Sequence, residues 1–174
     1  MVTTNASVTL DGGGLRFIAR SGGGHEVVLD DATGDTGMRP AELIPIAVAG
    51  CTAMDVITIL REKHQVVTSY EVRATAEQQE HQANAFIRID IVHVVAGRAI
   101  DIEVVRGAIE LAATNYCSGV GRTLSSGITE IHHAYVVRGD TGDEVAAEVI
   151  VTGPYDHVAP GLGSEPGPGW ITLR

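Results

Sequence analysis

The chain has 174 residues, 44% of them hydrophobic, which is enough apolar material for one domain of ordinary size with its own core. A formal net charge of −10 argues against nucleic acid or an anionic membrane as partner, and no uncharged apolar stretch reaches the roughly 20 residues that span a bilayer. Two cysteines are too few for a disulfide scaffold and the first ten residues lack a secretion signal, so we expect a cytoplasmic protein.

The first part of the chain predicts three short strands. Residues 6–10 form the first, and residues 15–20, where apolar and polar side chains alternate, form the second after the turn Asp11-Gly-Gly-Gly14. This pair is typical of a hairpin. A further glycine turn precedes a third strand at 25–30, and the composition of 31–37 predicts a loop.

A long helix is predicted to begin at Pro40 and to end near Lys63. Proline suits the first turn of a helix, because its missing N–H would have no partner there. Pro45 is less easily accommodated, since an interior proline removes one hydrogen bond and clashes with the preceding turn. We therefore expect a kink at Pro45, or a short helix followed by a second one that begins near it.

The second part of the chain predicts two strands, a helix and one or two more strands. These elements are a strand at 66–74, a loop at 76–84, a strand at 85–95, a helix capped by Asp101 and continuing through Leu124, a strand at 129–138 and a further strand at 144–151. The order βββ-α-ββ-α-β predicts an α+β fold. Because proline and glycine accumulate after residue 153, we divide the chain into a globular domain, residues 1–138, and a C-terminal strand with a Pro/Gly-rich tail, residues 139–174.

Cys51 and Cys117 each lie among small residues within an apolar segment of helical spacing. Small side chains let two backbones approach closely, as a disulfide requires, with Cα atoms roughly 4.4–6.8 Å apart. Buried free cysteines are, however, commonly inert and serve as small hydrophobic residues. The residues alone therefore leave two interpretations open, an inert pair and a redox-active pair.

The sequence predicts neither a metal site nor a bound cofactor. It contains no C-x-x-C motif, and no histidine stands at helical spacing from a cysteine. His132 and His133 are adjacent in a strand and should point to opposite faces of the sheet, which argues against a shared metal. No stretch matches a dinucleotide-binding loop or a phosphate-binding loop.

Three motifs occur in a characteristic order: Pro40-Ala-Glu-Leu43, Gly50-Cys-Thr-Ala-Met-Asp55 and Tyr116-Cys-Ser118. Together they resemble the OsmC/Ohr family of thiol peroxidases, and most closely the YhfA-like branch of OsmC-related proteins. Gly14-Leu-Arg-Phe17, Gly24-His25 and Asp30 are similar to that branch as well. The resemblance covers about residues 14–138, so residues 1–138 would form the OsmC-like domain.

The resemblance implies antiparallel sheets around two central helices, and an intertwined homodimer with each active site at the subunit interface. Members of the family reduce organic hydroperoxides and act as antioxidants in stress. Cys51 matches the attacking thiol and Cys117 the resolving thiol, which would join in a disulfide that an external dithiol reduces. The substrate would be a small-molecule hydroperoxide.

In hydroperoxidase members an arginine near the first hairpin and a glutamate after the proline activate the attacking thiol. Arg16 is the arginine nearest to the first hairpin turn, and the glutamate is displaced by one position to Glu42. Glu42 could orient an arginine, or could be a first-turn carboxylate that suits the helix dipole. Asp55, four residues after Cys51, could instead raise the pKa of the thiol.

Two further functions remain open on the same dimer. One is a non-catalytic protein that binds a small, lipid-like molecule in an apolar interface cleft. The other is a redox sensor.

Overall fold

The computed structural model describes residues 3–80, 85–116, 119–140, 142–152 and 171–172. Within this part, the chain forms two units that divide between Ile46 and Ala47. We describe each unit by itself.

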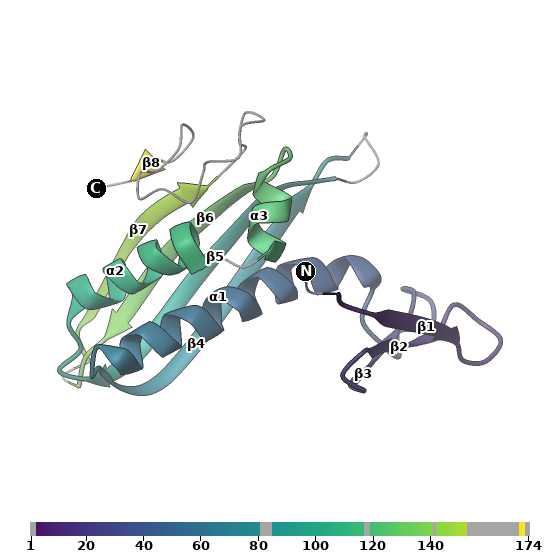
Figure 1. Ribbon diagram of the computed structural model, residues 1–174, viewed down its shortest axis with the longest axis horizontal. Helices are drawn as coiled ribbons and strands as arrows, with labels where there is room; N and C mark the ends of the chain where they lie inside the picture. Colours follow the sequence, from purple (N-terminus) through teal and green to yellow (C-terminus); the bar gives the residue numbers. More distant parts are fainter. Residues whose placement is uncertain (1–2, 81–84, 117–118, 141, 153–170, 173–174) are drawn as a thin grey trace. The chain divides into compact units, whose positions relative to one another are not determined.

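The first unit is built on a small antiparallel sheet (Figure 1). Its strands are β1 (Ala6–Leu10), β2 (Phe17–Ser21) and β3 (Glu26–Leu29), in the order β1-β2-β3. Phe17 pairs with Leu10 on one side and with Leu29 on the other. The three strands predicted from the alternating pattern are therefore confirmed.

A tight loop follows β3 and is organised by the buried carboxylate of Asp30. Asp30 accepts hydrogen bonds from the backbone N–H of Asp31 at 2.8 Å and from both the N–H and the hydroxyl of Thr36, at 3.1 Å and 2.5 Å. These hydrogen bonds, led by that of the Thr36 hydroxyl, hold the pKa of Asp30 below its ordinary value. A Cβ on Gly34 would collide with this carboxylate, which explains a glycine at that position.

The second unit contains a five-stranded sheet. Its strands are β4 (Val66–Gln78), β5 (Phe86–Arg98), β6 (Glu130–Arg138), β7 (Glu144–Thr152) and β8 (Ile171–Thr172), in that order. The α+β class is confirmed. The neighbouring strands pair antiparallel except β5 and β6, which are parallel. The chain reaches β6 by a helical crossover rather than a hairpin, and such a connection returns the strand in the same direction.

The first helix begins with a single 3₁₀ turn, Pro40–Glu42, and continues as α1, Leu43–Glu62. Pro45 therefore falls in the first turn of α1, where its missing N–H costs nothing. Of the two alternatives expected at Pro45, the structure has a short helix followed by a second one.

The predicted helix between β5 and β6 is interrupted. It consists of α2 (Ile102–Leu111), a π-helical turn (Ala112–Tyr116) and α3 (Gly119–Ser125). Asp101 caps α2 as predicted, since its side chain accepts hydrogen bonds from the backbone N–H groups of Glu103 and Val104 at 2.9 Å and 3.4 Å.

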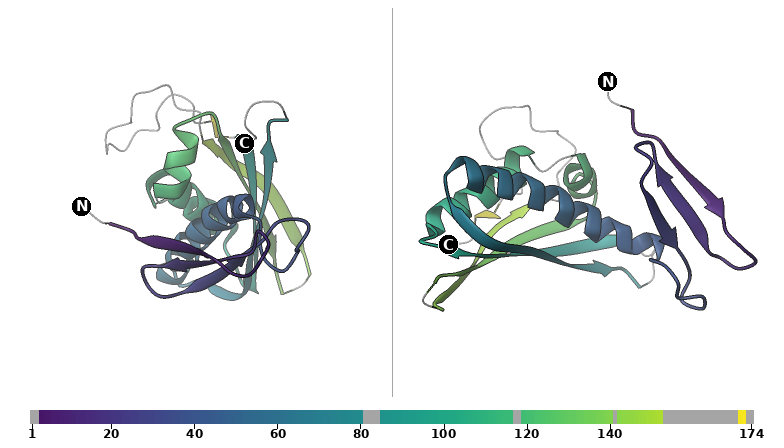
Figure 2. Two further views of the ribbon diagram at one scale, coloured as in Figure 1. Left: turned by 90° about the vertical axis from the view of Figure 1, so that its right-hand side faces the viewer. Right: turned by 90° about the horizontal axis from the view of Figure 1, so that it is seen from below.

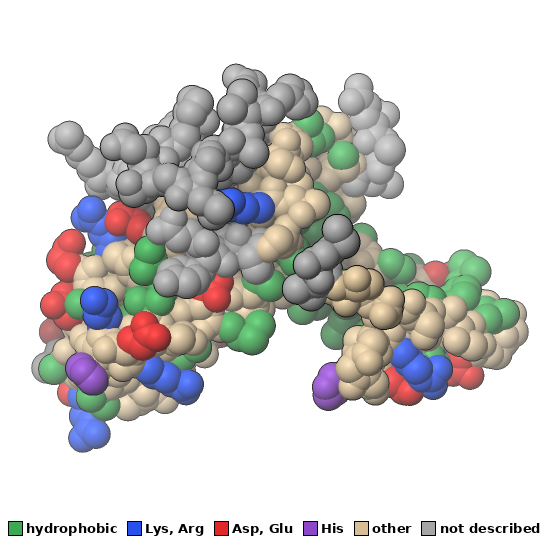
Figure 3. Space-filling model, in the orientation of Figure 1, with side chains coloured by type: hydrophobic (Ala, Val, Ile, Leu, Met, Phe, Trp, Pro, Cys, Tyr) green, Lys and Arg blue, Asp and Glu red, His purple; other side chains and the backbone are tan. Residues whose placement is uncertain are grey.

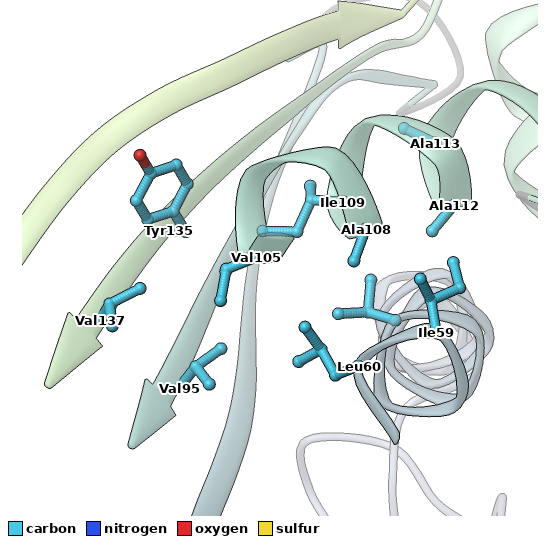
Figure 4. Close-up of a cluster of buried hydrophobic side chains, with 11 residues drawn as sticks. Ile59, Leu60, Val95, Val105, Ala108, Ile109, Ala112, Ala113, Tyr135 and Val137 are labelled. Atoms are coloured by element: carbon cyan, nitrogen blue, oxygen red, sulfur yellow. The ribbon is translucent and has the colours of Figure 1, made fainter. Parts of the chain in front are cut away.

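The three helices cover one face of the five-stranded sheet (Figure 2). Figure 4 shows the core between them, where side chains of α1 and α2 meet those of β5 and β6. Its buried members include Val56, Ile59 and Leu60 of α1, Val95 of β5, Val105 and Ile109 of α2, and Tyr135 and Val137 of β6.

The helical run Pro40–Glu62 is long and apolar enough, by length and composition alone, to cross a membrane, with a mean hydropathy of 2.0. Three of its residues belong to the core cluster, which identifies α1 as a core helix. Only 28% of its most apolar stretch is buried within the single chain. Ile46, Met54 and Thr58 are exposed, and most of the other residues of the helix are half-buried.

Candidate functional site

Cys51 lies on α1 with a free, half-buried thiol. The buried stripe of this helix consists of Val48, Thr52, Val56, Ile59 and Leu60. Cys51 lies beside this stripe, next to the fully buried Thr52, whose hydroxyl donates a hydrogen bond to the carbonyl of Val48 at 3.0 Å. Because the helix is anchored through that stripe, Cys51 is held at the margin of the core rather than within it. A partly exposed thiol can be reached by a small reagent.

Asp55 follows Cys51 by one helical turn, so the two residues lie on the same side of α1. Its Oδ2 atom is buried and has no hydrogen-bond partner in the described part of the chain. This burial raises the pKa of the Asp55 carboxyl. A protonated Asp55 carries no charge, so burial favours the form that does not repel a neighbouring thiolate.

Glu42 is bonded to Arg39 across Pro40. One carboxylate oxygen accepts the backbone N–H of Arg39 at 2.9 Å, and the other lies 3.5 Å from the Arg39 guanidinium. The same guanidinium is 2.9 Å from a carboxylate oxygen of Asp35. The arrangement is a capping box at the start of the helix, and it fixes the arginine side chain between two carboxylates.

Arg16 pairs instead with Asp11 across the first hairpin turn. Among the described residues no ion pair joins Arg16 to Glu42, so the structure does not bring these two sequence candidates together. Sequence reasoning overlooked Arg39. Arg39 stands three residues before Glu42, on the other side of the proline that starts the helix, and this spacing is the sequence pattern that could have indicated the pair.

The first unit carries a cleft of about 600 Å³. It is lined mainly by apolar side chains, with the charged residues in the loop and at the helix start: Val8, Leu15, Phe17, Leu29, Asp30, Asp31, Ala32, Arg39 and Pro40. Leu15 and Val8 are 62% and 57% exposed. Figure 3 shows hydrophobic side chains open to solvent on this three-stranded unit. The cleft can therefore accept an apolar molecule, and the Arg39 that lines it is already paired with Asp35 and Glu42.

Cys117 lies outside the described residues. Its predicted pairing with Cys51 therefore stays a prediction from the sequence.

The neighbouring histidines His132 and His133 point to opposite faces of β6, as predicted. His132 lies 3.1 Å from Glu130 and 3.2 Å from Glu148, whereas His133 is fully buried on the helix-covered face. Within the described ranges, no group of three or more His, Cys, Asp or Glu side chains is arranged to hold a metal ion.

A row of three polar rings, a half-buried tyrosine and two fully buried histidines, crosses the second unit. The Tyr70 oxygen lies 2.7 Å from Nδ1 of His93, and Nε2 of His93 lies 3.4 Å from Nδ1 of His133. The rings are stacked, with centroids 6.1 Å and 5.7 Å apart. Burial lowers the pKa of His93 to about 3 and that of His133 to about 4, and it raises the pKa of Tyr70. Both histidines are therefore neutral at physiological pH.

Comparison with known proteins gives a consistent result. Residues 32–133 match the family described as OsmC-like protein. Protein YhfA of Escherichia coli (strain K12) is 36% identical over 124 residues, which cover 71% of this chain and 91% of that protein.

Solved structures share the fold. A hypothetical protein from Aquifex aeolicus VF5 has a TM-score of 0.70 at 19% identity, over 80% of this chain and 99% of that one. An organic hydroperoxide resistance protein from Elizabethkingia anophelis, with thiocyanate bound, has a TM-score of 0.55 at 18% identity, over 80% and 98%. At these identities the likeness is one of fold alone.

Lowering the pH should destabilise the protein through His93 and His133. Their pKa values in the folded protein are about 3 and about 4, below the value of about 6.5 in an unfolded chain, so the unfolded chain binds more protons in between. The free energy of unfolding should fall below about pH 6.5, by up to about 1.4 kcal/mol per pH unit for each histidine. The fall ends as the pH passes each folded pKa.

Urea denaturation at a series of pH values measures this slope. The variant His133→Phe should have a shallower slope, because one buried titrating group is lost. A slope unaffected by His133→Phe would contradict the assignment.

Proposed function

The chain belongs to the family of OsmC-like proteins, and from this premise we propose that it is a thiol peroxidase that reduces organic hydroperoxides. The observation that carries the proposal is Cys51, a free and half-buried thiol on the long apolar helix within the matched region. A structural cysteine would be expected to be sealed in the core, and Cys51 lies at its margin.

In the first step the Cys51 thiolate attacks one oxygen of the hydroperoxide O–O bond. An S–O bond forms, the O–O bond breaks, and the leaving alkoxide takes up a proton to become an alcohol. Cys51 is oxidised to a sulfenic acid, and the hydroperoxide is reduced by two electrons.

In the second step the Cys117 thiol attacks the sulfenic sulphur. A disulfide forms between Cys51 and Cys117, and water leaves. An external dithiol then restores both thiols by two thiol–disulfide exchanges and is itself oxidised. A cytoplasmic setting would keep such a dithiol reduced.

A positive charge must favour the Cys51 thiolate, since Cys51 lies several turns from the start of the helix, where the dipole effect has faded. Arg16 was the sequence candidate, with Glu42 beside it. Glu42 is bonded to Arg39 and not to Arg16, so Glu42 is a positioning residue for Arg39 within the first unit, and Arg16 stays the candidate cation proposed from the sequence. Arg39 also lines the apolar cleft of its unit.

We further propose that the protein works as a homodimer in which a second copy covers α1. Ile46 and Met54 on this helix are 51% and 65% exposed. A Cβ added to Gly50 would meet no atom within 4 Å, so the surface beside Cys51 is open in the single chain. Apolar and small residues exposed along one helix are typical of an interface with another chain.

One observation favours a second function, the non-catalytic binding of a lipid-like molecule. The cleft of about 600 Å³ falls within the range of small-molecule sites and is mostly apolar. A binding protein would need this cleft but not the thiol chemistry. The variant Cys51→Ser separates the two functions, since only a peroxidase loses its activity.

Treatment with cumene hydroperoxide under non-reducing conditions should remove two hydrogens from the intact mass. Peptide mapping should then find a Cys51–Cys117 disulfide, because the sulfenic acid condenses with the second thiol. Peroxide consumption should fall to the background rate in Cys51→Ser. Variant Cys117→Ser should accumulate sulfenic and over-oxidised Cys51.

An intact mass that does not change, together with unaltered peroxide consumption in Cys51→Ser, would exclude the peroxidase. Retention of a fluorescent fatty acid by both the wild type and Cys51→Ser would then support the binding function.

Sedimentation should detect a dimer in the wild-type protein and a monomer in Met54→Asp, because a buried unpaired carboxylate at the interface is costly. Val145→Asp places the same charge on an apolar residue of β7 that is 41% exposed, and it should leave the dimer intact. A monomeric wild type would refute this part of the proposal.

A further inference from the structure

The row formed by Tyr70, His93 and His133 takes no part in the proposed thiol chemistry. Its three residues come from the adjacent strands β4, β5 and β6. Tyr70 pairs with Val95, and His133 pairs with Ile91, so the two are diagonal neighbours of His93 on the helix-covered face. The row runs from a half-buried tyrosine on β4, the first strand of the sheet, to fully buried imidazoles in its middle.

Hydrogen bonding along this row has two consistent directions. A neutral imidazole has one nitrogen that donates and one that accepts. In one direction the Tyr70 hydroxyl donates to Nδ1 of His93, Nε2–H of His93 donates to Nδ1 of His133, and Nε2 of His133 carries a hydrogen. In the other direction every bond is reversed, and Nε2 of His133 presents a lone pair.

The inner end of the row is unsatisfied. Nε2 of His133 is buried and has no hydrogen-bond partner in the part of the chain that the structure describes. A buried polar atom without a partner loses its hydration and gains nothing in return, so native proteins rarely leave one. An oxygen atom that can both accept and donate would satisfy Nε2 in either direction of the row.

We propose that Tyr70, His93 and His133 form a proton relay between solvent at the sheet edge and a hydroxyl oxygen bound at Nε2 of His133. When that oxygen is deprotonated, His133 gives it the Nε2 hydrogen and takes one at Nδ1 from His93. His93 in turn takes the hydroxyl hydrogen of Tyr70, and Tyr70 regains a proton from solvent. One proton thus moves inward, and both histidines exchange tautomers without becoming charged.

Burial supports this role, because it keeps both imidazoles neutral and so able to donate and accept at once. Tyr135 provides a contrast. It is the direct neighbour of His93 on β6 and belongs to the core cluster, but none of the hydrogen bonds described for the row includes it. A buried aromatic side chain next to His93 can therefore pack in the core without hydrogen bonding to the row. The relay does not depend on the peroxidase reaction.

Nitrogen NMR of the full-length chain with ¹⁵N-labelled histidine tests the relay at neutral pH. In the wild type, a scalar coupling through the hydrogen bond should join Nε2 of His93 to Nδ1 of His133. Tyr70→Phe removes only the outer hydroxyl and should change the tautomer populations of His133, although another ring separates the two residues. Tyr135→Phe removes the corresponding hydroxyl beside the row and should leave the populations unchanged.

Solvent exchange separates a relay from a static network. If protons travel along the row, exchange of the His133 Nε2 hydrogen should be about tenfold slower in Tyr70→Phe, because the route to solvent is cut. A purely structural role predicts the reverse, since a destabilised variant opens more often and exchanges faster. Faster or unchanged exchange, or absence of the coupling in the wild type, would overturn the proposal.

The bound hydroxyl can come from water or from an alcohol, and tert-butanol distinguishes the two sources. A saturable shift of His133 Nε2 would assign an alcohol. Magnetisation transfer from water to the Nε2 hydrogen, without such a shift, would assign an internal water. If neither is observed, no oxygen is bound at Nε2 and the proposed inner end is wrong.

Discussion

The burial of one stripe of α1 against the five-stranded sheet is the interaction on which the larger unit depends. Val56 and Leu60 are fully buried there, in one cluster with Val95 and Val105. Burying a side chain of this size is worth about 1.5–3 kcal/mol. The stripe fixes the rotation of the helix and so decides that Cys51 emerges at its flank. The same helix is apolar beyond its stripe, and Ile46 and Met54 stay exposed in the single chain.

The buried polar groups Asp30, Asp55 and the pair His93 and His133 differ in how their surroundings set their protonation state. Asp30 stays ionised because three hydrogen bonds surround its carboxylate. His93 and His133 stay neutral because burial disfavours their charged forms. Asp55 has an oxygen without a partner, and burial moves it toward its protonated form. Charge is thus retained only where the backbone and a hydroxyl can solvate it.

Much of the fold could be predicted from the sequence, because alternation and capping are local signals. The strands and the opposed faces of His132 and His133 follow from a period of two residues, and the cap at Asp101 follows from a residue type that favours helix starts. The parallel pairing of β5 and β6 could not be predicted, since strand direction depends on how a distant crossover packs.

Two features of the site were missed for different reasons. Arg39 was overlooked because its bond to Glu42 spans a proline, where the local pattern gives only a helix start. The row through Tyr70 and His93 joins strands by register, which no single stretch of sequence reveals.

The parallel pair has a consequence for how the chain folds. Strands β4 and β5 meet across a short connection, whereas β5 and β6 cannot pair until the whole crossover at 99–129 has closed. Closing this loop costs conformational entropy before any stabilising contact between β5 and β6 can form, so topologies of this kind fold slowly. We expect the hairpin to form early and the rate of folding to be set by the docking of the crossover helices.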